Sequence, residues 1–428
     1  RKAVDNLKIR LSYGSLGNQQ IGYYDFIQTI TTKGSMSDYS FDGTVLGQHA
    51  TVSDPVSGDQ TWEKVVSKNL GLDLNMFNNR LSLTTDFYIR DTKGILGKGK
   101  SLPSIYGASE PQMNANNLRT KGYELVLGWR DSFKLAGSTF SYGITGTFSD
   151  YTAEYTKCDN PTGLIGDPYV GKKYGEIWGY KVDGLFRNDK EAAEYASRID
   201  LSTVASGYYT ATGAYGKGVR GGDIKYLDLN GDNIVNGGKG TLDDPGDRRV
   251  IGNSSPRYQY GASLNFSWYG FDVSVFMQGI GRLDWYPGAD NLRFWGPYCR
   301  PYATFVPKNF MSQVWSEENP DAYFPRARAY TSLNSNSGTA YYTNDRYLQN
   351  LAYCRLKNLT IGYTIPRRLT SKVGIKECRI YFSGENLATW SALKSDFLDP
   401  EQAAADSDKK ANVYPWCKTY SIGLNLTF

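Results

Sequence analysis

The sequence predicts an all-β protein, an antiparallel transmembrane β-barrel of the outer-membrane type. Roughly ten segments alternate apolar and polar residues with period two, the pattern of strands that present one face to an apolar medium. The connections between them alternate between short and long, as the periplasmic turns and external loops of such barrels do. The chain also carries 34 Tyr and 9 Trp, residue types that suit a membrane interface.

Composition and charge exclude several other classes. Mean hydropathy is −0.49, and no stretch approaches the ~20 consecutive apolar residues that a membrane-spanning helix needs. The net charge of the 428 residues is only +5, and the basic residues are scattered, so no nucleic-acid partner is expected. The five cysteines show neither a CxxC motif nor a metal-ligand spacing.

The alternating segments follow one another along the whole chain. In the first, Leu7, Ile9 and Leu11 alternate with polar residues, and in the last, Tyr420–Phe428, every even position is large and apolar. An unpaired terminal strand of that kind would invite aggregation, so we expect it to close a barrel. The ten segments run through Leu7–Tyr13, Val66–Met76, Leu81–Ile89, Tyr123–Trp129, Phe140–Phe148, Tyr258–Trp268, Phe271–Met277, Leu359–Ile365, 377–390 and 416–428.

The lengths of the connections predict how the barrel is oriented in the membrane. Short ones are predicted at Asn78-Asn79, residues 131–138, Tyr269-Gly270 and residues 366–377. Long ones are predicted over residues 15–65, 95–117, 154–255, 282–349 and 391–415. Because outer-membrane barrels have short periplasmic turns, the last strand is expected to end on the periplasmic side. A soluble sandwich also alternates, but its strands usually run to about 5–6 residues, shorter than the strands predicted here.

One segment breaks the pattern. Arg355 and Lys357 would continue the apolar face of Leu359 toward the long-loop side. Either the strand rises above the lipid there, or a β-bulge changes its register.

Sequence blocks along the chain resemble the SusC/RagA family of TonB-dependent outer-membrane transporters. Two late blocks carry much of the resemblance: LKNLTIGYTIP at Leu356–Pro366, and GENL at Gly384–Leu387 with DPE at Asp399–Glu401. The other blocks, spread in order along the chain, are Leu11–Gly14 with Gly17-Asn18, Trp62–Lys64, Asn69–Asp73, Asn79–Ser82, Lys121–Glu124, Gly179–Gly184 and Trp315 to Pro325-Arg326.

The resemblance implies a 22-stranded barrel filled by an N-terminal plug domain. Residues 1–428 are then expected to be the C-terminal portion of the barrel, without the plug, the early strands or the segment that contacts TonB. No signal peptide opens the sequence, so residues are expected to be missing upstream. The implied activity is import of a large nutrient, an oligosaccharide or a peptide, across the outer membrane of a Gram-negative cell. The implied partners are the TonB-ExbB-ExbD complex, a SusD-like surface lipoprotein and outer-membrane lipid.

One segment has the spacing of a calcium loop. Asp228, Asn230 and Asp232 supply oxygens at positions 1, 3 and 5, and the Ile234 carbonyl can add another. Position 12, where Glu is usual, is Lys239, so a carboxylate from Asp243, Asp244 or Asp247 would have to replace it. The sequence predicts a structural Ca²⁺ in an external loop, and an acidic turn without metal is the alternative.

A cluster of aromatic residues follows the seventh segment. It comprises Trp285, Tyr286, Phe294, Trp295, Tyr298, Tyr302 and Phe305. Such rings form a loop core, contact a protein partner or, least expected, stack on a sugar ligand.

Catalysis finds no support in the sequence. The single histidine, His49, lies in a Gly/Thr-rich stretch, so histidine-based triads and His-rich metal centres are not expected. Beyond the calcium prediction, no cofactor is expected. The alternative function, in a different class, is a non-transporting surface adhesin or glycan-binding module rich in β structure.

Overall fold

The computed structural model describes most of the chain. The described residues are 3–18, 27–33, 40–41, 44–45, 49–58, 60–98, 105, 111–210, 218–299, 306, 308–328, 333, 338–395, 398–405 and 414–428. No helix in these ranges is both long and apolar enough to cross a membrane.

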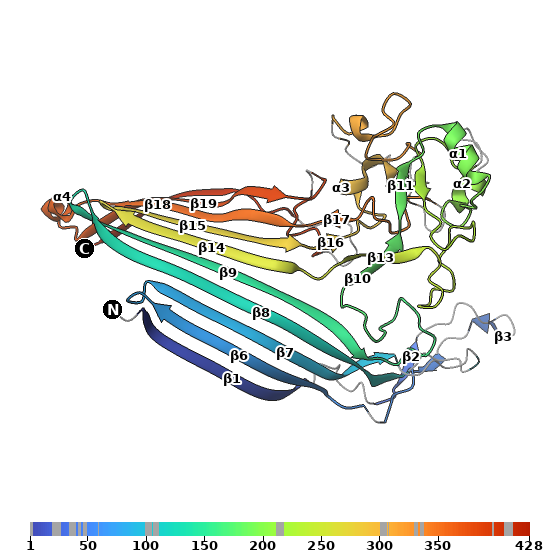
Figure 1. The fold of residues 1–428 in the computed structure, drawn as a ribbon, viewed down its shortest axis with the longest axis horizontal. Coiled ribbons are helices and arrows are strands. Elements are labelled where there is room, and N and C mark those ends of the chain that lie inside the picture. Colours follow the sequence, from blue (N-terminus) through green and yellow to red (C-terminus); the bar gives the residue numbers. More distant parts are fainter. Residues whose placement is uncertain are drawn as a thin grey trace.

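A single antiparallel sheet of ten strands organises the molecule, in the order β1-β6-β7-β8-β9-β14-β15-β18-β19-β20. Figure 1 shows the strands side by side in one curved sheet, with tight turns and both marked chain ends at one end. The strands are β1 (Val4–Asn18), β6 (Glu63–Met76), β7 (Leu81–Lys98), β8 (Gln112–Leu135), β9 (Ser138–Lys157), β14 (Arg257–Trp268), β15 (Phe271–Arg282), β18 (Tyr353–Thr364), β19 (Glu377–Ser391) and β20 (Thr419–Thr427). Each predicted segment corresponds to one of these strands, which confirms the predicted fold class.

The remaining elements are short and lie in the connections. The paired strands are β2 (Ile30–Lys33) with β5 (His49–Val52), β3 (Ser40–Phe41) with β4 (Thr44–Val45), β10 (Glu176–Tyr180) with β13 (Arg248–Asn253), β11 (Val182–Leu185) with β12 (Ile224–Tyr226), and β16 (Asp284–Trp285) with β17 (Gln349–Asn350). The helices are α1 (Asp189–Ala196), α2 (Ser206–Thr210), α3 (Leu292–Trp295), η2 (Gly296–Tyr298), η3 (Met311–Gln313), α4 (Arg367–Thr370) and η5 (Ser371–Val373).

The tight turns need backbone conformations that few residues adopt. Ala136-Gly137 joins β8 to β9 and Tyr269-Gly270 joins β14 to β15, with all four residues at positive φ. Two-residue hairpin turns of this kind match the twist of the strands that they join. The predicted connection at residues 131–138 was therefore too wide. The strands continue into it because Phe133 and Phe140 pair across them, with ring centroids 5.3 Å apart.

The two faces of the sheet differ in chemistry. One face carries continuous cross-strand rows of apolar side chains, and the other carries charged and polar ones. A representative apolar row crosses five adjacent strands at Met76, Leu81, Trp129, Ile144 and Leu264. In a membrane barrel the first face meets lipid and the second lines the lumen.

A β-bulge in β18 accounts for the irregular segment. Facing β15, the register passes from Asn358 to Leu356, which leaves Lys357 without a cross-strand partner residue. The pairing with β19 shifts at the same position. Of the two predicted explanations, the structure therefore confirms the β-bulge. The bulge changes the register at Lys357, which interrupts the apolar alternation of the strand at Arg355 and Lys357.

The largest buried core lies outside the sheet. Residues 158–256, 283–352 and 392–418 connect β9 to β14, β15 to β18 and β19 to β20, and we call their described parts the loop domain. Buried hydrophobic residues from Tyr180 to Ala403 form one cluster there. Figure 1 shows most of this domain at the end of the sheet opposite the tight turns.

Candidate functional site: the polar sheet face and the loop domain

Ion pairs across neighbouring strands organise the polar face. The Arg10 guanidinium on β1 donates to Asp73 on β6 at 2.9 Å and to Asp86 on β7 at 2.8 Å. Gly71 makes this arrangement possible, since a Cβ there would collide with the guanidinium. One cation therefore ties three strands together on the polar face.

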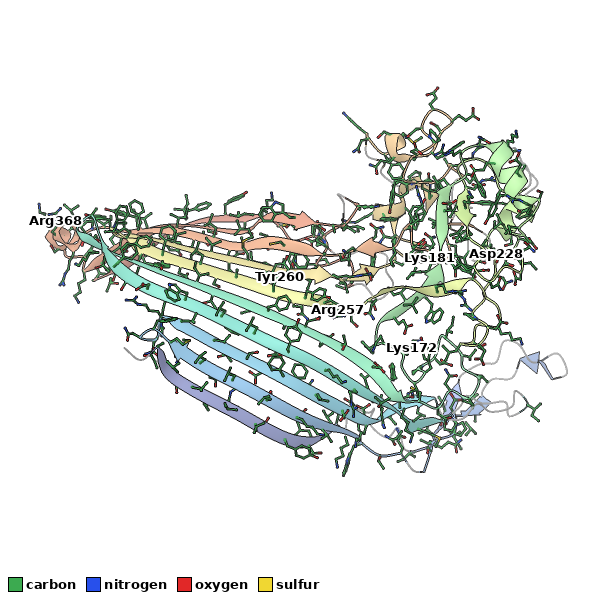
Figure 2. All side chains as sticks on the ribbon, in the orientation of Figure 1. Lys172, Lys181, Asp228, Arg257, Tyr260 and Arg368 are labelled. Carbon is green, nitrogen blue, oxygen red and sulfur yellow. The ribbon has the colours of Figure 1, made fainter. Side chains whose placement is uncertain are left out.

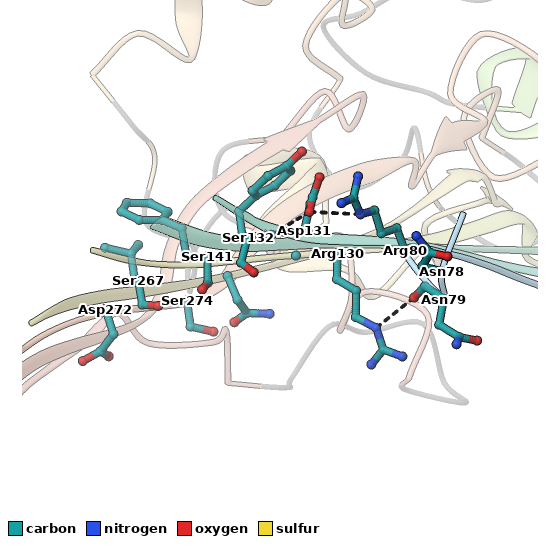
Figure 3. A pocket seen from close by; sticks show the side chains of 15 residues that line it. Asn78, Asn79, Arg80, Arg130, Asp131, Ser132, Ser141, Ser267, Asp272 and Ser274 are labelled. Atoms are coloured by element: carbon teal, nitrogen blue, oxygen red, sulfur yellow. Dashed lines mark hydrogen bonds and ion pairs between the residues drawn. The ribbon is translucent and has the colours of Figure 1, made fainter. Parts of the chain in front are cut away.

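A polar hollow of about 840 Å³ lies near the tight turns. Figure 3 shows side chains from several strands around it, including Arg130, Ser132, Ser274 and Asp272. The Arg130 side chain donates to the Asn79 carbonyl at 3.2 Å, which fixes it beside the β6–β7 turn. The sheet thus offers a polar surface at this end.

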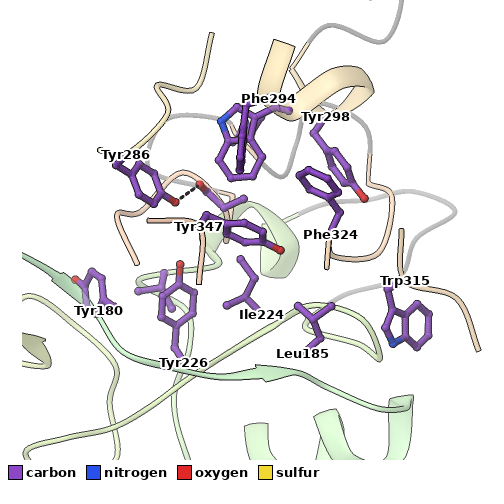
Figure 4. Packing of buried hydrophobic residues seen from close by; sticks show 14 of the residues in the cluster. Tyr180, Leu185, Ile224, Tyr226, Tyr286, Phe294, Tyr298, Trp315, Phe324 and Tyr347 are labelled. Atoms are coloured by element: carbon purple, nitrogen blue, oxygen red, sulfur yellow. Dashed lines mark hydrogen bonds between the residues drawn. The ribbon is translucent and has the colours of Figure 1, made fainter. Parts of the chain in front are cut away.

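The loop domain is built on aromatic packing. Figure 4 shows Tyr286, Phe294, Tyr298 and Phe324 gathered around Tyr347. The Trp295 and Tyr347 ring centroids are 5.0 Å apart, and the Tyr347 and Phe324 rings stack at 6.2 Å. Edge-to-face and offset contacts of this kind stabilise beyond the area they bury. The β9–β14 and β15–β18 connections therefore share one core.

A buried ion pair joins the same two connections. Both carboxylate oxygens of Asp223 accept from Arg328, at 2.9 and 2.6 Å. Their side chains are only 1% and 3% exposed. Burial raises the pKa of the Asp223 carboxyl, while the Arg328 guanidinium opposes that shift. Next to the pair, the backbone N–H of Arg326 donates to the Gly222 carbonyl at 2.7 Å.

The buried tyrosines of the loop domain are held neutral. Burial raises the pKa of Tyr180 and Tyr323 to about 12. It raises the pKa of Tyr226, Tyr286 and Tyr347 further still. A phenolate would lose its hydration in this core, so these hydroxyls stay protonated and act as hydrogen-bond donors. Tyr286, for example, donates to the Ala340 carbonyl at 3.1 Å.

The predicted aromatic cluster forms part of this core. All five of its described rings are buried, with exposed fractions from 0% to 8%: Trp285, Tyr286, Phe294, Trp295 and Tyr298. Tyr302 and Phe305 lie outside the described residues. The structure therefore corrects the ligand-contact and partner-contact interpretations of these five rings, because their faces are covered by other loop residues.

The predicted calcium loop is compact and held by its own side chains. Asp228 accepts the backbone N–H groups of Gly231 and Asn233 at 2.7 and 2.9 Å. Asn230 accepts from Asp232 N–H at 3.1 Å, and Asp232 accepts from Ile234 N–H at 2.8 Å. The three oxygen-bearing side chains thus turn toward the same short loop.

The carboxylates that were expected to complete the calcium site differ in role. Asp247 is fully buried and accepts the backbone N–H groups of Leu229 and Asn236 at 2.7 and 2.9 Å. Asp243 is exposed. Asp247 therefore braces the loop through backbone contacts. Among the described residues, no three His, Cys, Asp or Glu side chains form a group that could hold a metal ion.

The irregular segment of β18 contains an ion-pair network that the sequence analysis missed. Arg355 is 2% exposed and donates to both carboxylate oxygens of Asp399 at 2.7 Å. It also contacts Glu401 at 2.8 Å, and Lys357 contacts the same Glu401 at 2.7 Å. The sequence contained the two halves of this network, the cations Arg355 and Lys357 on an apolar face and the acidic residues of the DPE motif. Only the fold shows that they form ion pairs.

Figure 2 labels side chains at successive positions along the length of the molecule. Arg368 lies at the tight-turn end, Tyr260 within the sheet and Arg257 close to the loop domain, which holds Lys181 and Asp228. The loop domain therefore stands at the end of the sheet away from the tight turns.

Comparison with known proteins gives relatives along the entire chain. No family model matches. TonB-dependent receptor P3 of Formosa agariphila is 26% identical over 99% of this chain and 40% of its own length. TonB-dependent receptor SusC of Bacteroides thetaiotaomicron is 22% identical over 99% of this chain and 38% of its own length. The chain thus spans about two fifths of the curated relatives that it matches.

Solved structures agree with the fold. The RagAB peptide transporter superposes over 100% of this chain and 41% of the matched chain, with a TM-score of 0.68 and 21% identity. The fold likeness and the sequence likeness cover the same residues, including the motif blocks identified in the sequence. Along its whole length in sequence, and in fold, the chain is similar to TonB-dependent receptors of the SusC and RagA type.

Proposed function

We propose that this chain forms part of an outer-membrane transporter that imports a large nutrient with energy from the TonB-ExbB-ExbD complex. The observation that carries the proposal is the sheet itself, with a continuous apolar face and an opposite face of ion pairs and polar side chains. Such a sheet is stable in lipid only when its apolar face is outward and its polar face lines a hydrated lumen.

The loop domain supports a role in substrate capture. It stands at the long-loop end, which is the external end in outer-membrane barrels. Its shared core gives a structured surface above the lumen. A SusD-like surface lipoprotein is the proposed partner on that surface, as the relatives SusC and RagAB suggest. The relative RagAB is a peptide transporter, so peptides join oligosaccharides as the proposed substrate classes.

The open edges of the sheet support completion of the barrel by further strands. Within the described residues, β1 pairs with β6 and β20 with β19, but β1 and β20 do not pair with each other. Unpaired strand edges are not tolerated in the hydrocarbon region. We therefore propose that residues 1–428 form the C-terminal portion of a 22-stranded barrel, with a plug and the TonB contact supplied by additional sequence.

A structural Ca²⁺ in the loop at Asp228–Asn236 remains part of the proposal. Two carboxylates, an amide oxygen and a backbone carbonyl form a set of hard oxygen donors, which suits Ca²⁺. The ligands would be Asp228, Asn230, Asp232 and the Ile234 carbonyl. An ion there would stabilise the external loop and take no part in transport.

Uptake by a deletion strain tests the proposal. Loss of the full-length gene should abolish growth on one polymer or peptide class, and dissipation of the inner-membrane proton gradient should stop uptake in the wild type. Unchanged growth and uptake across oligosaccharide and peptide panels would overturn it. A protein that is extracted without detergent and shows no heat-modifiable band on gels would instead favour the adhesin or glycan-binding alternative.

A further inference from the structure

Lysines gather on the apolar face of β6–β9, at the end of the sheet that leads into the long loops. One cross-strand row places Lys68 on β6, Ile89 on β7 and Lys121 on β8 side by side. The row four positions further along pairs Lys64 with Lys93 and continues through Asn117 to Lys157. All five lysine side chains are exposed. We call them the lysine rows.

The row between them is already neutralised. Asp91 accepts from Arg119 at 2.7 Å, and Glu154 is paired with Lys173. Within the part of the chain that the structure describes, no ion pair involves Lys64, Lys68, Lys93 or Lys121. The neighbouring carboxylates are therefore engaged with other cations, and the lysine rows carry net positive charge.

Lys64 and Lys93 are directly opposite on neighbouring strands. Like charges in this position destabilise an antiparallel pair, because their Cβ atoms are only about 5 Å apart. A bound anion would remove that cost. The arrangement thus suits a ligand with more than one negative charge.

The position of the lysines relative to the aromatic residues indicates where the anion would come from. Phe87, Tyr123 and Phe148 form a chain of rings across β7–β9, with centroids 6.4 and 6.0 Å apart. Apolar rows fill the sheet on one side of this chain, and the lysine rows begin one row beyond it on the other. Aromatic belts mark the membrane interface, so the lysines would stand at headgroup level.

An apolar hollow adjoins the lysines. Its volume is about 650 Å³, and the side chains of the apolar face that line it are Leu11, Tyr13, Lys68, Leu70, Phe87 and Ile89. Cationic and apolar side chains therefore meet at one place. An amphipathic ligand satisfies both, whereas a soluble polyanion satisfies only the lysines.

We propose that the lysine rows and this hollow form a binding site for a phosphorylated lipid of the outer leaflet. The lysines contact the headgroup phosphates, and the hollow accepts part of an acyl chain. This inference rests on the proposed function, since it requires the apolar face to meet membrane lipid. It assigns a specific anionic lipid contact to one sector of the barrel wall, on β6–β9.

The test uses the full-length protein purified in a neutral detergent. Its affinity for vesicles of neutral phospholipid containing phosphorylated lipid A is measured against vesicles with dephosphorylated lipid A. The variant carries K64Q, K68Q, K93Q and K121Q together. A control variant with the same charge change carries K8Q, K134Q, K190Q and K372Q, whose positions lie outside the lysine rows.

The expected result is a loss of about fivefold in affinity for each lysine removed from the rows. The control variant and the dephosphorylated vesicles isolate that loss, since neither should show it. Equal affinity of the two quadruple variants, or equal binding to both lipids, would overturn the inference. Displacement of the lipid by inorganic phosphate at matched phosphate concentration would overturn it as well.

Membrane insertion and uptake are measured on the same variants, which separates the two proposals. A heat-modifiable protein that imports substrate but has no phosphate preference refutes the lipid site alone. A protein that never enters the membrane refutes the proposed function.

Discussion

Asp223 and Arg328, which are 105 residues apart in the sequence, form a buried ion pair with two hydrogen bonds between the β9–β14 and β15–β18 connections. Because each connection supplies one partner and both supply rings to one core, neither connection can form its buried structure alone. The loop domain should therefore fold and unfold as one unit.

The first prediction concerns this ion pair. R328M leaves the Asp223 carboxylate buried without its cation, so we expect the loop domain to lose about 3–5 kcal/mol of stability. Urea unfolding of the full-length protein, followed by near-UV circular dichroism of the aromatic core, measures the loss. The control is K190M, which removes an exposed partner of Glu194 at 3.9 Å and should cost under about 0.5 kcal/mol. Equal midpoints for the two variants would contradict the prediction.

The second prediction is alkaline destabilisation. The pKa of Tyr180 is about 12 in the folded protein, against about 10 in an unfolded chain. A raised folded pKa gives a contribution that is complete below about pH 10 and is lost as pH rises toward about 12. The loss for this tyrosine is about 2–3 kcal/mol. Unfolding free energies measured across this pH range should fall accordingly.

Y180F provides the matched comparison for the pH effect. Phenylalanine cannot ionise in the unfolded chain, so the variant should lose less stability than the wild type over the same range. Y174F, at an exposed position, should follow the wild-type slope. Parallel pH profiles for wild type and Y180F would exclude this origin of the effect.

The third prediction concerns calcium. If Asp228 and Asp232 hold Ca²⁺, chelation should lower the melting temperature of the loop domain, and D232A should abolish that response. D159N removes an exposed carboxylate elsewhere in the loop domain and should keep it. The direct measurement is the calcium content of the native protein, determined by mass spectrometry. An absence of bound Ca²⁺ at millimolar free calcium would remove the site.

The fourth prediction concerns sheet assembly. A Cβ on Gly423 of β20 would overlap the Tyr381 ring on the adjacent strand β19. G423A should therefore displace that ring and reduce the yield of heat-modifiable, folded protein. G146A is the control, because a Cβ at Gly146 meets no atom within 4 Å. Similar yields for both variants would show that the ring moves without cost.

The sequence by itself determined the ten strands and the chemistry of the two faces. Period-two alternation is a local property, because successive side chains on a strand point to opposite sides. Tight turns were also readable, since Tyr269-Gly270 and Asn78-Asn79 interrupt the alternation. The family resemblance of the motif blocks added the expected number of strands in the whole barrel, the plug domain and the expected partners.

Only the tertiary structure decided which residues of the long connections meet. Arg328 with Asp223, and Arg355 with Asp399, are far apart in the sequence, and no period or spacing links them. The aromatic residues after β15 also needed the fold, because the same rings suit a core, a partner surface or a ligand. Burial distinguishes these, and burial depends on segments that pack from three different connections. The structure was also needed to place Lys64 beside Lys93, because strand register is set by pairing and cannot be read from one strand.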